Sequence, residues 1–270
     1  MNLFPPPSCV PFWAQLTRLQ ELCGHPLVPL DETVSTNSDA LTLGRNGAAA
    51  GTLVIARRQT GGRGRLGKRW ISHPDGGLFF SVLLRPDLDP ADLPKITLAA
   101  GVALCRAISR ICGLKPTIKW PNDLLINGRK CGGILAEAEF LDNGVLVVLG
   151  IGLNVATPAT AFPAELREKT TALNRHDPAV TDRQLSLLAA ILTEMDVVIA
   201  TMEEGGFAGI LAEWRALDYT LGRQLTWLTT AGETVHGISL GPDADGRLHI
   251  KDDQGRIHEV LSGDIRLQSP

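Results

Sequence analysis

A basic, glycine-rich segment between Arg57 and Trp70 holds the residues of this chain best suited to chemistry on an anion. Four glycines, at positions 61, 62, 64 and 67, let the backbone bend tightly and approach a ligand, because no Cβ stands in the way. The segment carries these basic residues and no carboxylate: Arg57, Arg58, Arg63, Arg65, Lys68 and Arg69. Uncompensated cations beside loop amides suit a phosphate or a carboxylate, so the segment predicts an anion-binding loop.

The spacing Gly62-x-Gly64-x-x-Gly67 also matches the glycine fingerprint of dinucleotide-binding folds, but its context does not. In those folds a helix begins at the third glycine, and an acidic residue follows about 20 positions later. Here the chain leads to Pro74, and the later region is the apolar run LFFSVLL. The Gly-Lys-Ser/Thr of a phosphate-binding P-loop is absent as well. The remaining alternative to a ligand loop is a solvated basic loop that binds nothing.

A second set of polar residues, Lys119-Trp120-Pro121-Asn122-Asp123, lies at the end of an expected short strand. The residue before a proline favours extended backbone, and strand alternation puts Lys119 on the face opposite Trp120. Lys119 is therefore well held for contact with a charged ligand. Asn122 and Asp123 are either ordinary turn residues or functional, and Asp123 could hold a metal ion or orient Lys119.

Two further expected strands carry internal glycines, Gly132-Gly133 in one and Gly150 and Gly152 in the other. Such glycines mark a bulge or a close backbone approach. Together the two strands suggest a flat ligand lying against the sheet, and bulges without a ligand are the alternative. The segment 35–37, Ser-Thr-Asn, reads as a helix N-terminus whose hydroxyls and amide could equally bind a polar ligand head.

Hydrophobic patterns predict the elements that position these segments. Strands are expected at 52–56, 78–84, 117–120, 123–126, 131–137 and 145–152, and helices at 92–112 and 181–204. Asp92 is expected to cap the first helix, Gly113 to end it, and Thr181 with Gln184 to cap the second. Four short strands follow Leu217, at 225–228, 235–240, 248–251 and 257–261. Because strands and helices do not alternate regularly, the fold class is α+β, with domains at 1–217 and 218–270, the second a small β-barrel.

Bulk composition narrows the class of protein. The 270 residues are 44% hydrophobic and 20% charged with a net charge of −3, so the protein as a whole is not expected to bind nucleic acid or another large polyanion. Its positive charge is local, as in an anion site. No secretory signal appears near the Pro5-Pro6-Pro7 run, and the longest apolar run, at 145–153, is too short to span a membrane. Cysteines occur singly at Cys9, Cys23, Cys105, Cys112 and Cys131. Reduced thiols in a cytoplasmic protein without a zinc site are expected.

Taken together, these motifs resemble the biotin protein ligases, or biotin–[acetyl-CoA-carboxylase] ligases. The matching segments, in the family's order, are Ser35-Thr36-Asn37, Gln59, Gly62-Arg63-Gly64-Arg65-x-Gly67 with Trp70, Lys119 to Asp123, Gly132 to Leu135 and Gly150 to Asn154. The tail adds Leu221-Gly222-Arg223, His236-Gly237-Ile238, Gly246-Arg247-Leu248 and Ser262-Gly263-Asp264. The resemblance implies a mixed-sheet catalytic domain related to class II synthetases and a C-terminal SH3-like barrel.

The resemblance also implies a two-step reaction. Biotin and MgATP give biotinyl-5′-AMP, and a lysine of a biotin carboxyl carrier domain then displaces AMP. Lys119 would be the catalytic lysine, with Arg63 and Arg65 stabilising the developing charge. Biotin would contact Ser35, Thr36, Asn37, Gln59, Arg63, Gly64, Arg65, Lys119, Gly132, Gly133, Gly150 and Gly152. ATP would contact Arg65, Trp70, Lys119, Asn122 and Asn154, and Asp123 would lie near Mg²⁺. The glycine loop is expected to order over the adenylate and exclude water.

The sequence departs from the family pattern at two places, and it leaves two other functions open. Lys68 replaces a common arginine, which leaves its role open. The 34 residues before Ser35 are too few and too proline-rich for a helix-turn-helix domain, so a monofunctional ligase is expected. One alternative is a lipoate or octanoyl ligase, whose Arg-Arg-x-x-Gly-Gly-Gly loop is absent here. Another is a non-catalytic biotin- or adenylate-binding regulator. A homodimer is possible, because the family often dimerises.

Overall fold

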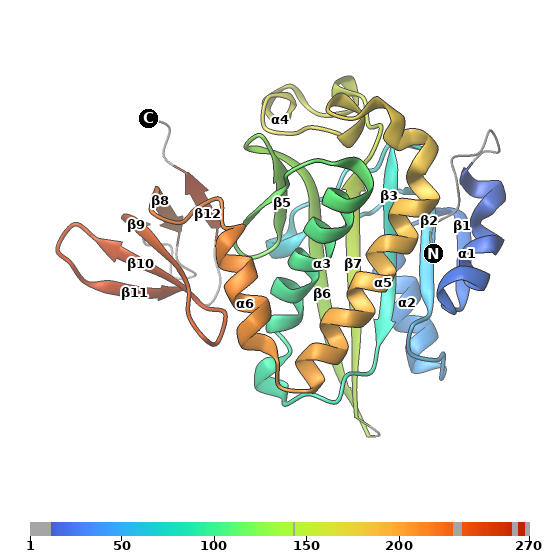
Figure 1. The fold of residues 1–270 in the computed structure, drawn as a ribbon, viewed down its shortest axis with the longest axis horizontal. Helices are drawn as coiled ribbons and strands as arrows, with labels where there is room; N and C mark the ends of the chain where they lie inside the picture. Colours follow the sequence, from blue (N-terminus) through green and yellow to red (C-terminus); the bar gives the residue numbers. More distant parts are fainter. Residues whose placement is uncertain (1–11, 143, 229–233, 261–263, 268–270) are drawn as a thin grey trace.

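The larger of two β-sheets has seven strands and carries the predicted site (Figure 1). The computed structural model describes residues 12–142, 144–228, 234–260 and 264–267. The strands are β1 (Leu27–Thr33), β2 (Leu53–Gln59), β3 (Gly77–Leu84), β4 (Thr117–Lys119), β5 (Asp123–Ile126), β6 (Arg129–Leu141) and β7 (Gly144–Asn154). They lie in the order β1-β2-β3-β7-β6-β5-β4, with β1 and β2 parallel and the other neighbours antiparallel. This mixed sheet confirms the predicted α+β class.

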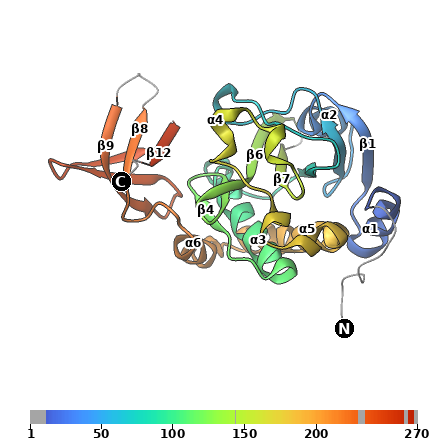
Figure 2. The same cartoon turned by 90° about the horizontal axis from the view of Figure 1, so that it is seen from above.

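Helices cover both faces of the large sheet (Figure 2). They are α1 (Leu16–Cys23), α2 (Thr36–Arg45), α3 (Lys95–Cys112), α4 (Ala164–Arg167), α5 (Gln184–Glu203) and α6 (Phe207–Ala216). Helices α3 and α5 pack together on one face, flanked by α1 and α6, while α2 packs on the other face against β2, β3 and β7. Those three central strands are buried on both sides, which explains the continuous apolar run in β3.

The α3 and α5 face holds the main hydrophobic core. Buried residues of both helices, such as Leu104 and Leu188, belong to one cluster with Leu53, Phe80 and Leu149 of the sheet. Ala40 of α2 forms a second, small cluster with Val54 and Val148 on the opposite face. The core thus fixes α2 and the central strands rigidly, and these elements lead directly into the predicted site.

The starts of the two long helices differ from the sequence prediction. Asp92 does not cap α3, because a 3₁₀ turn, η3 (Pro90–Asp92), precedes the helix and Asp89 caps that turn through the Ala91 amide at 2.8 Å. The expected capping box of α5 is also wrong. Thr181 lies inside η6 (Pro178–Arg183) and donates its hydroxyl to the carbonyl of Pro178 at 3.1 Å. The expected end of α3 at Gly113 is confirmed by its left-handed φ of 68°.

One helical stretch, Pro178–Glu203, is long and apolar enough to cross a membrane by composition, which the expectation from the shorter apolar run overlooked. Most of this stretch is buried inside the protein, and α5 packs against α3 and α1. A helix that is apolar on nearly all sides is what the centre of a large core requires.

The smaller sheet is antiparallel throughout and lies beside α6 (Figure 1). It contains β8 (Gln224–Leu228), β9 (Thr234–Pro242), β10 (Leu248–Asp252), β11 (Ile257–Val260) and β12 (Asp264–Leu267), in the order β11-β10-β9-β8-β12. The four predicted strands are confirmed, apart from Leu261, which lies outside the described residues together with Ser262 and Gly263. Strand β12 was not predicted.

Three contacts fix the smaller sheet against the larger unit. The indole Nε1 of Trp120 donates to the carbonyl of Gly246 at 3.0 Å in a buried position. Arg215 of α6 donates to the carbonyl of Pro242 at 2.7 Å, and Lys95 at the start of α3 lies 3.6 Å from Asp245. The smaller sheet is therefore attached beside the residue that follows Lys119.

Candidate active site

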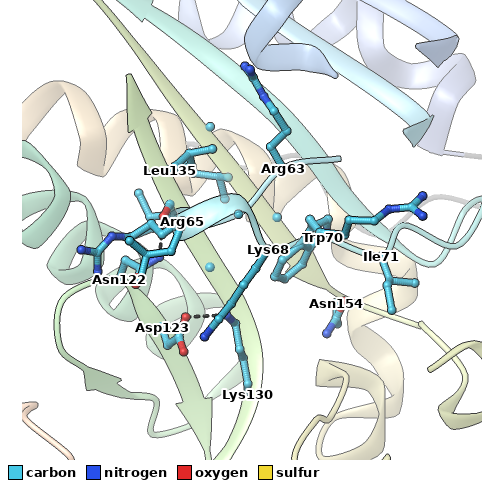
Figure 3. Close-up of a pocket in the computed structure, with 18 of the residues that line it drawn as sticks. Arg63, Arg65, Lys68, Trp70, Ile71, Asn122, Asp123, Lys130, Leu135 and Asn154 are labelled. Carbon is cyan, nitrogen blue, oxygen red and sulfur yellow. Dashed lines mark hydrogen bonds and ion pairs between the residues drawn. The ribbon is translucent and has the colours of Figure 1, made fainter. Parts of the chain in front are cut away.

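A cavity of about 390 Å³ brings together nearly all of the residues that the motifs singled out (Figure 3). Its walls come from the start of α2, the end of β2, the glycine loop, the β4–β5 turn, the first half of β6 and the C-terminal end of β7. The predicted residues that line it are Ser35, Thr36, Asn37, Gln59, Arg63, Gly64, Arg65, Trp70, Lys119, Asn122, Asp123, Gly133, Gly150, Gly152 and Asn154. Gly132 does not line the cavity, because the place of its absent Cβ faces Leu153 at 3.1 Å.

The glycine loop forms a short hairpin over the cavity. Arg63 and Arg69 pair as an antiparallel bridge, and the Gly64 amide donates to the carbonyl of Lys68 at 2.7 Å. At the tip, Leu66 and Gly67 adopt left-handed φ angles of 55° and 71°. This hairpin does not lead into a helix of the dinucleotide-binding kind, in agreement with the reading of its sequence context.

The indole of Trp70 occupies the surface of the two glycine strands. Gly133 and Gly152 are register partners on β6 and β7. A Cβ on Gly152 would lie 2.3 Å from the indole, and one on Gly133 would lie 3.2 Å from it. The flat group that the glycines admit in this structure is therefore a side chain of the loop. Its buried Nε1 has no hydrogen-bond partner among the described residues.

A dense polar network surrounds Asn37. Its amide nitrogen donates to Glu137 Oε2 at 2.7 Å and to the carbonyl of Leu135 at 3.2 Å, and its oxygen accepts from the Ser81 hydroxyl at 2.6 Å. Gly150 makes room for this arrangement, because a Cβ there would lie 2.0 Å from the Asn37 oxygen. The amide of Asn37 is thus satisfied by the protein itself.

Gln59 takes the place of the expected cap at the start of α2. Its Oε1 accepts from the Thr36 amide at 2.9 Å and lies 3.2 Å from the Thr36 hydroxyl. Ser35 is the N-cap residue by position, but its side chain makes no capping hydrogen bond. The buried Ser35 side chain lines the cavity without being used to cap the helix.

The cavity is strongly cationic. Among the described residues, its lining contains one carboxylate, Asp123, and these basic residues: Arg63, Arg65, Lys68, Arg69, Lys119, Lys130 and Lys169. Asp123 forms an ion pair with Lys130 (Figure 3). In the part of the chain that the structure describes, no group of three His, Cys, Asp or Glu residues could hold a metal ion. The site therefore has the charge to bind a small anion that carries several negative charges.

Arg65 is held inside this cavity by its surroundings. Loss of solvation on burial lowers the pKa of the guanidinium, and the charge of Asp123 opposes that shift. Its central carbon lies 5.8 Å from the ring centroid of Trp120, the residue fixed by Gly246 of the smaller sheet. A cation with reduced hydration is a strong partner for an entering phosphate, because little water has to be displaced.

Asn122 and Asn154 both support the backbone around the cavity. The Asn122 amide donates to the carbonyl of Ile134 at 2.8 Å, and the buried Asn154 amide donates to that of Thr171 at 3.2 Å. Each therefore fixes a wall of the cavity.

Sequence reasoning gave no role to Lys130, at the start of the first glycine segment, and did not predict the wall around α4. Lys130 pairs with Asp123, and its ammonium lies 5.6 Å from the ring centroid of Trp70. The wall consists of Phe162, Leu166, Lys169 and Thr170, and Ile265 of β12 adds a contact from the smaller sheet. The sequence feature that could have pointed to Lys130 is its position directly before the expected strand at 131–137. The residues of the wall form no recognisable sequence pattern.

Comparisons with known proteins agree with this geometry. The model of the Biotin/lipoate A/B protein ligase family matches residues 31–154, and that of the Biotin protein ligase C terminal domain matches residues 220–267. The bifunctional ligase/repressor BirA of Bacillus subtilis is 36% identical over 248 residues, which are 92% of this chain and 75% of that protein.

A second relative and a solved structure are also named as ligases. The biotin–[acetyl-CoA-carboxylase] ligase of Mycobacterium tuberculosis is 34% identical over 87% of this chain and 86% of that protein. The structure of the biotin protein ligase from Aquifex aeolicus in complex with biotin and ATP superposes with a TM-score of 0.77 at 30% identity. That match covers 91% of this chain and 99% of the other.

Proposed function

Because this chain belongs to the biotin protein ligase family, we propose that it attaches biotin to a specific lysine of a biotin carboxyl carrier domain, using ATP and a biotinyl-5′-AMP intermediate. The observation that supports this most directly is the shared cavity. It places the polar residues at 35–37 and Gln59 beside Arg65, Lys119 and Lys130. One site can thus hold a small polar acid next to a nucleotide phosphate.

In the first step the biotin carboxylate attacks the α-phosphorus of ATP, and pyrophosphate leaves. Both reactants are anions, and two unit charges about 4 Å apart repel by roughly 4 kcal/mol at an effective dielectric constant of about 20. The cationic lining offsets this repulsion, most effectively where charge develops in the transition state. Arg65 is the arginine best placed for this role, because it is desolvated and lies inside the cavity.

Two lysines are candidates to bridge the carboxylate and the α-phosphate. Lys119 was predicted for this role, and it lines the cavity at the end of β4. Lys130 also lines it, paired with Asp123 and next to the Trp70 ring. We assign the reaction to both lysines jointly. The ion pair with Asp123 fixes the position of Lys130.

In the second step the amine of the carrier lysine attacks the acyl carbon, and AMP leaves. The hairpin loop lies over the cavity, and closure there would keep water away from the mixed anhydride until the carrier arrives. On the biotin side, Ser35, Thr36 and Gln59 are proposed to bind the ureido edge. Asn37 is proposed to support the side of the cavity formed by Ser35, Thr36 and Gln59, because its amide is already bonded within the protein.

Magnesium is proposed to enter with its substrate, as MgATP, and not through a metal site of the protein. Mg²⁺ in nucleotide sites keeps several waters and binds mainly to the substrate phosphates, with one or two carboxylates at most. Asp123, the one carboxylate among the described residues of the lining, would then be its nearest protein group, and it is paired with Lys130. We also propose that the protein is cytoplasmic, that it forms a homodimer and that it binds neither nucleic acid nor membranes. The proposed boundary between its two domains lies at 217/218.

A transfer assay tests the function directly. Protein, ATP, Mg²⁺, labelled biotin and a purified carrier domain are mixed, and label on the carrier lysine is measured by intact mass. A parallel reaction with lipoate and a lipoyl domain tests the alternative that the family match leaves open. Transfer of biotin alone supports the proposal, and transfer of lipoate alone contradicts it. Binding of biotin with no transfer to any carrier would favour a non-catalytic regulator.

A further inference from the structure

Glu137 of β6 connects two parts of the site, although no motif contains a role for it. Its Oε2 accepts a hydrogen bond from the Asn37 amide at 2.7 Å and from the Arg63 guanidinium at 2.8 Å. Asn37 belongs to α2, next to the proposed biotin contacts Ser35 and Thr36, whereas Arg63 belongs to the hairpin loop. One carboxylate oxygen therefore joins the loop to the wall of the cavity.

The Asn37 side of this contact is rigid. Asn37 also bonds Leu135 and Ser81, so its position does not depend on Arg63. Through this network the Glu137 carboxylate is held at a fixed place on the sheet. Its side chain is 29% exposed, which leaves one side open to a partner from the loop.

The Arg63 side of the contact belongs to the hairpin loop. At the base of the loop the Gly61 amide donates to the carbonyl of Val34 at 2.9 Å and Arg69 donates to the carbonyl of Thr60 at 3.1 Å. On the other side of the cavity, Arg65 lies over the ring of Trp120, so the Arg63–Glu137 pair is the contact that joins the loop to Asn37. Figure 3 shows the Arg63 side chain directed away from Asp123 and Lys130. The Arg63 side chain thus extends to β6, where its guanidinium forms an ion pair with Glu137.

We propose that Glu137 is a positioning residue that holds the hairpin loop closed through Arg63 and so limits the loss of the activated intermediate to water. The inference rests on the proposed ligase function. Hydrolysis adds water to the acyl carbon of biotinyl-5′-AMP and breaks the acyl–phosphate bond, which gives biotin, AMP and a proton. A weaker latch therefore raises the amount of AMP formed for each biotin transferred.

Glu137→Gln separates the two contacts of this residue. The amide oxygen of glutamine can still accept from Asn37, but the charge that attracts Arg63 is lost. We expect the AMP formed per biotin transferred, and the release rate of preformed biotinyl-5′-AMP, to rise about two- to fivefold, the range that a partly exposed ion pair supports. The KM for biotin should stay nearly unchanged, because Asn37 keeps its partner.

Glu139→Gln is the matched control. Glu139 lies two residues further along β6, so its side chain is on the same face of the sheet. It pairs with Arg45 at 2.9 Å, with side-chain exposures of 33% and 54% that resemble those of the Glu137–Arg63 pair. Arg45 belongs to α2 and not to the hairpin loop, so the AMP-to-biotin ratio should stay at the wild-type value.

A salt titration of the wild-type protein is a second test of the ion pair. Ionic screening weakens an exposed ion pair, so the wild-type AMP-to-biotin ratio should rise between 50 mM and about 500 mM NaCl toward that of Glu137→Gln, which should change little. Absence of biotin transfer by the wild type would refute the ligase function itself. Transfer with identical ratios in wild type and Glu137→Gln refutes the latch. A raised KM for biotin with an unchanged ratio refutes it too, and confines Glu137 to supporting Asn37.

Discussion

The side chain of Asn37 fills the space that the absent Cβ of Gly150 leaves open, with its oxygen 2.0 Å from where that atom would lie. Three hydrogen bonds prevent Asn37 from moving aside. The glycine of β7 and the asparagine of α2 therefore belong to one packing unit, although they are far apart in sequence.

Gly150→Ala should accordingly damage the biotin side of the site. Overpacking of a rigid interior is expected to destabilise the fold by about 1–3 kcal/mol and to raise the KM for biotin more than that for ATP. Urea unfolding and steady-state kinetics measure the two effects. Gly209→Ala in α6 is the control, because nothing lies within 4 Å of its Cβ position. Equal effects of the two substitutions would contradict the assigned packing.

Lys119→Ala and Lys130→Ala test the proposed sharing of the bridging role. Removing one charged donor from a preorganised site typically lowers kcat by about 10²–10³-fold, and we expect a loss of that size in ATP–pyrophosphate exchange for each variant. Circular dichroism should show an unchanged fold. Normal exchange by either variant removes that lysine from the mechanism.

Arg129→Ala is the matched control for the lysine variants. Arg129 is the neighbour of Lys130 on β6, and it pairs with the exposed Glu168 outside the cavity at 3.0 Å. Its loss should leave the exchange rate within about twofold of wild type, since exposed pairs contribute little. A large loss of exchange here would indicate a general effect of removing positive charge.

Trp120→Phe tests the connection between the two sheets. The change keeps an aromatic ring but leaves the buried carbonyl of Gly246 without its donor, which should destabilise the protein by about 1–3 kcal/mol. Because the ring also lies over Arg65, the KM for ATP should rise. Trp214→Phe gives the same loss of volume at a buried indole whose Nε1 has no partner among the described residues. Greater destabilisation by Trp214→Phe would overturn this account of the link.

The sequence was sufficient for the site segments because their chemistry is local. Glycine at positions such as 67 and 113 is needed for a left-handed φ, and Trp120-Pro121 restricts the backbone beside Lys119. Alternating and continuous apolar runs likewise predicted the strands and their burial. Each of these features depends on a residue and its immediate neighbours.

The features that were missed depend on register and tertiary packing. The partnership of Lys130 with Asp123 follows from a register shift between β5 and β6 at Leu124 and Leu125, which simple alternation does not reveal. The helix starts were misjudged because 3₁₀ turns begun at Pro90 and Pro178 precede the α-helices. No role was predicted for Glu137 from the sequence, because its contacts are with the distant residues Asn37 and Arg63.

Stability should also depend on pH through His25. This buried imidazole lies 3.1 Å from Asp196 and 2.6 Å from the carbonyl of Gly51. The hydrogen bond with Asp196 raises the pKa of His25 above 6.5, with a smaller contribution from Gly51, whereas burial opposes the shift. Only the protonated ring donates to both acceptors, so the charged form is favoured in the folded state.

The sign of the dependence follows from that raised value. The stabilisation that charged His25 contributes is fully present below its unfolded pKa of about 6.5. It is lost as the pH rises through the higher pKa of His25 in the folded state. Cys23 does not interfere, because burial raises the pKa of its thiol to about 11. We expect the free energy of unfolding to fall by less than about 1 kcal/mol from pH 6 to pH 8, since Asp196 is largely exposed. Asp196→Asn should flatten this slope in urea titrations at each pH. A slope that persists unchanged in that variant would assign the pH dependence to another group.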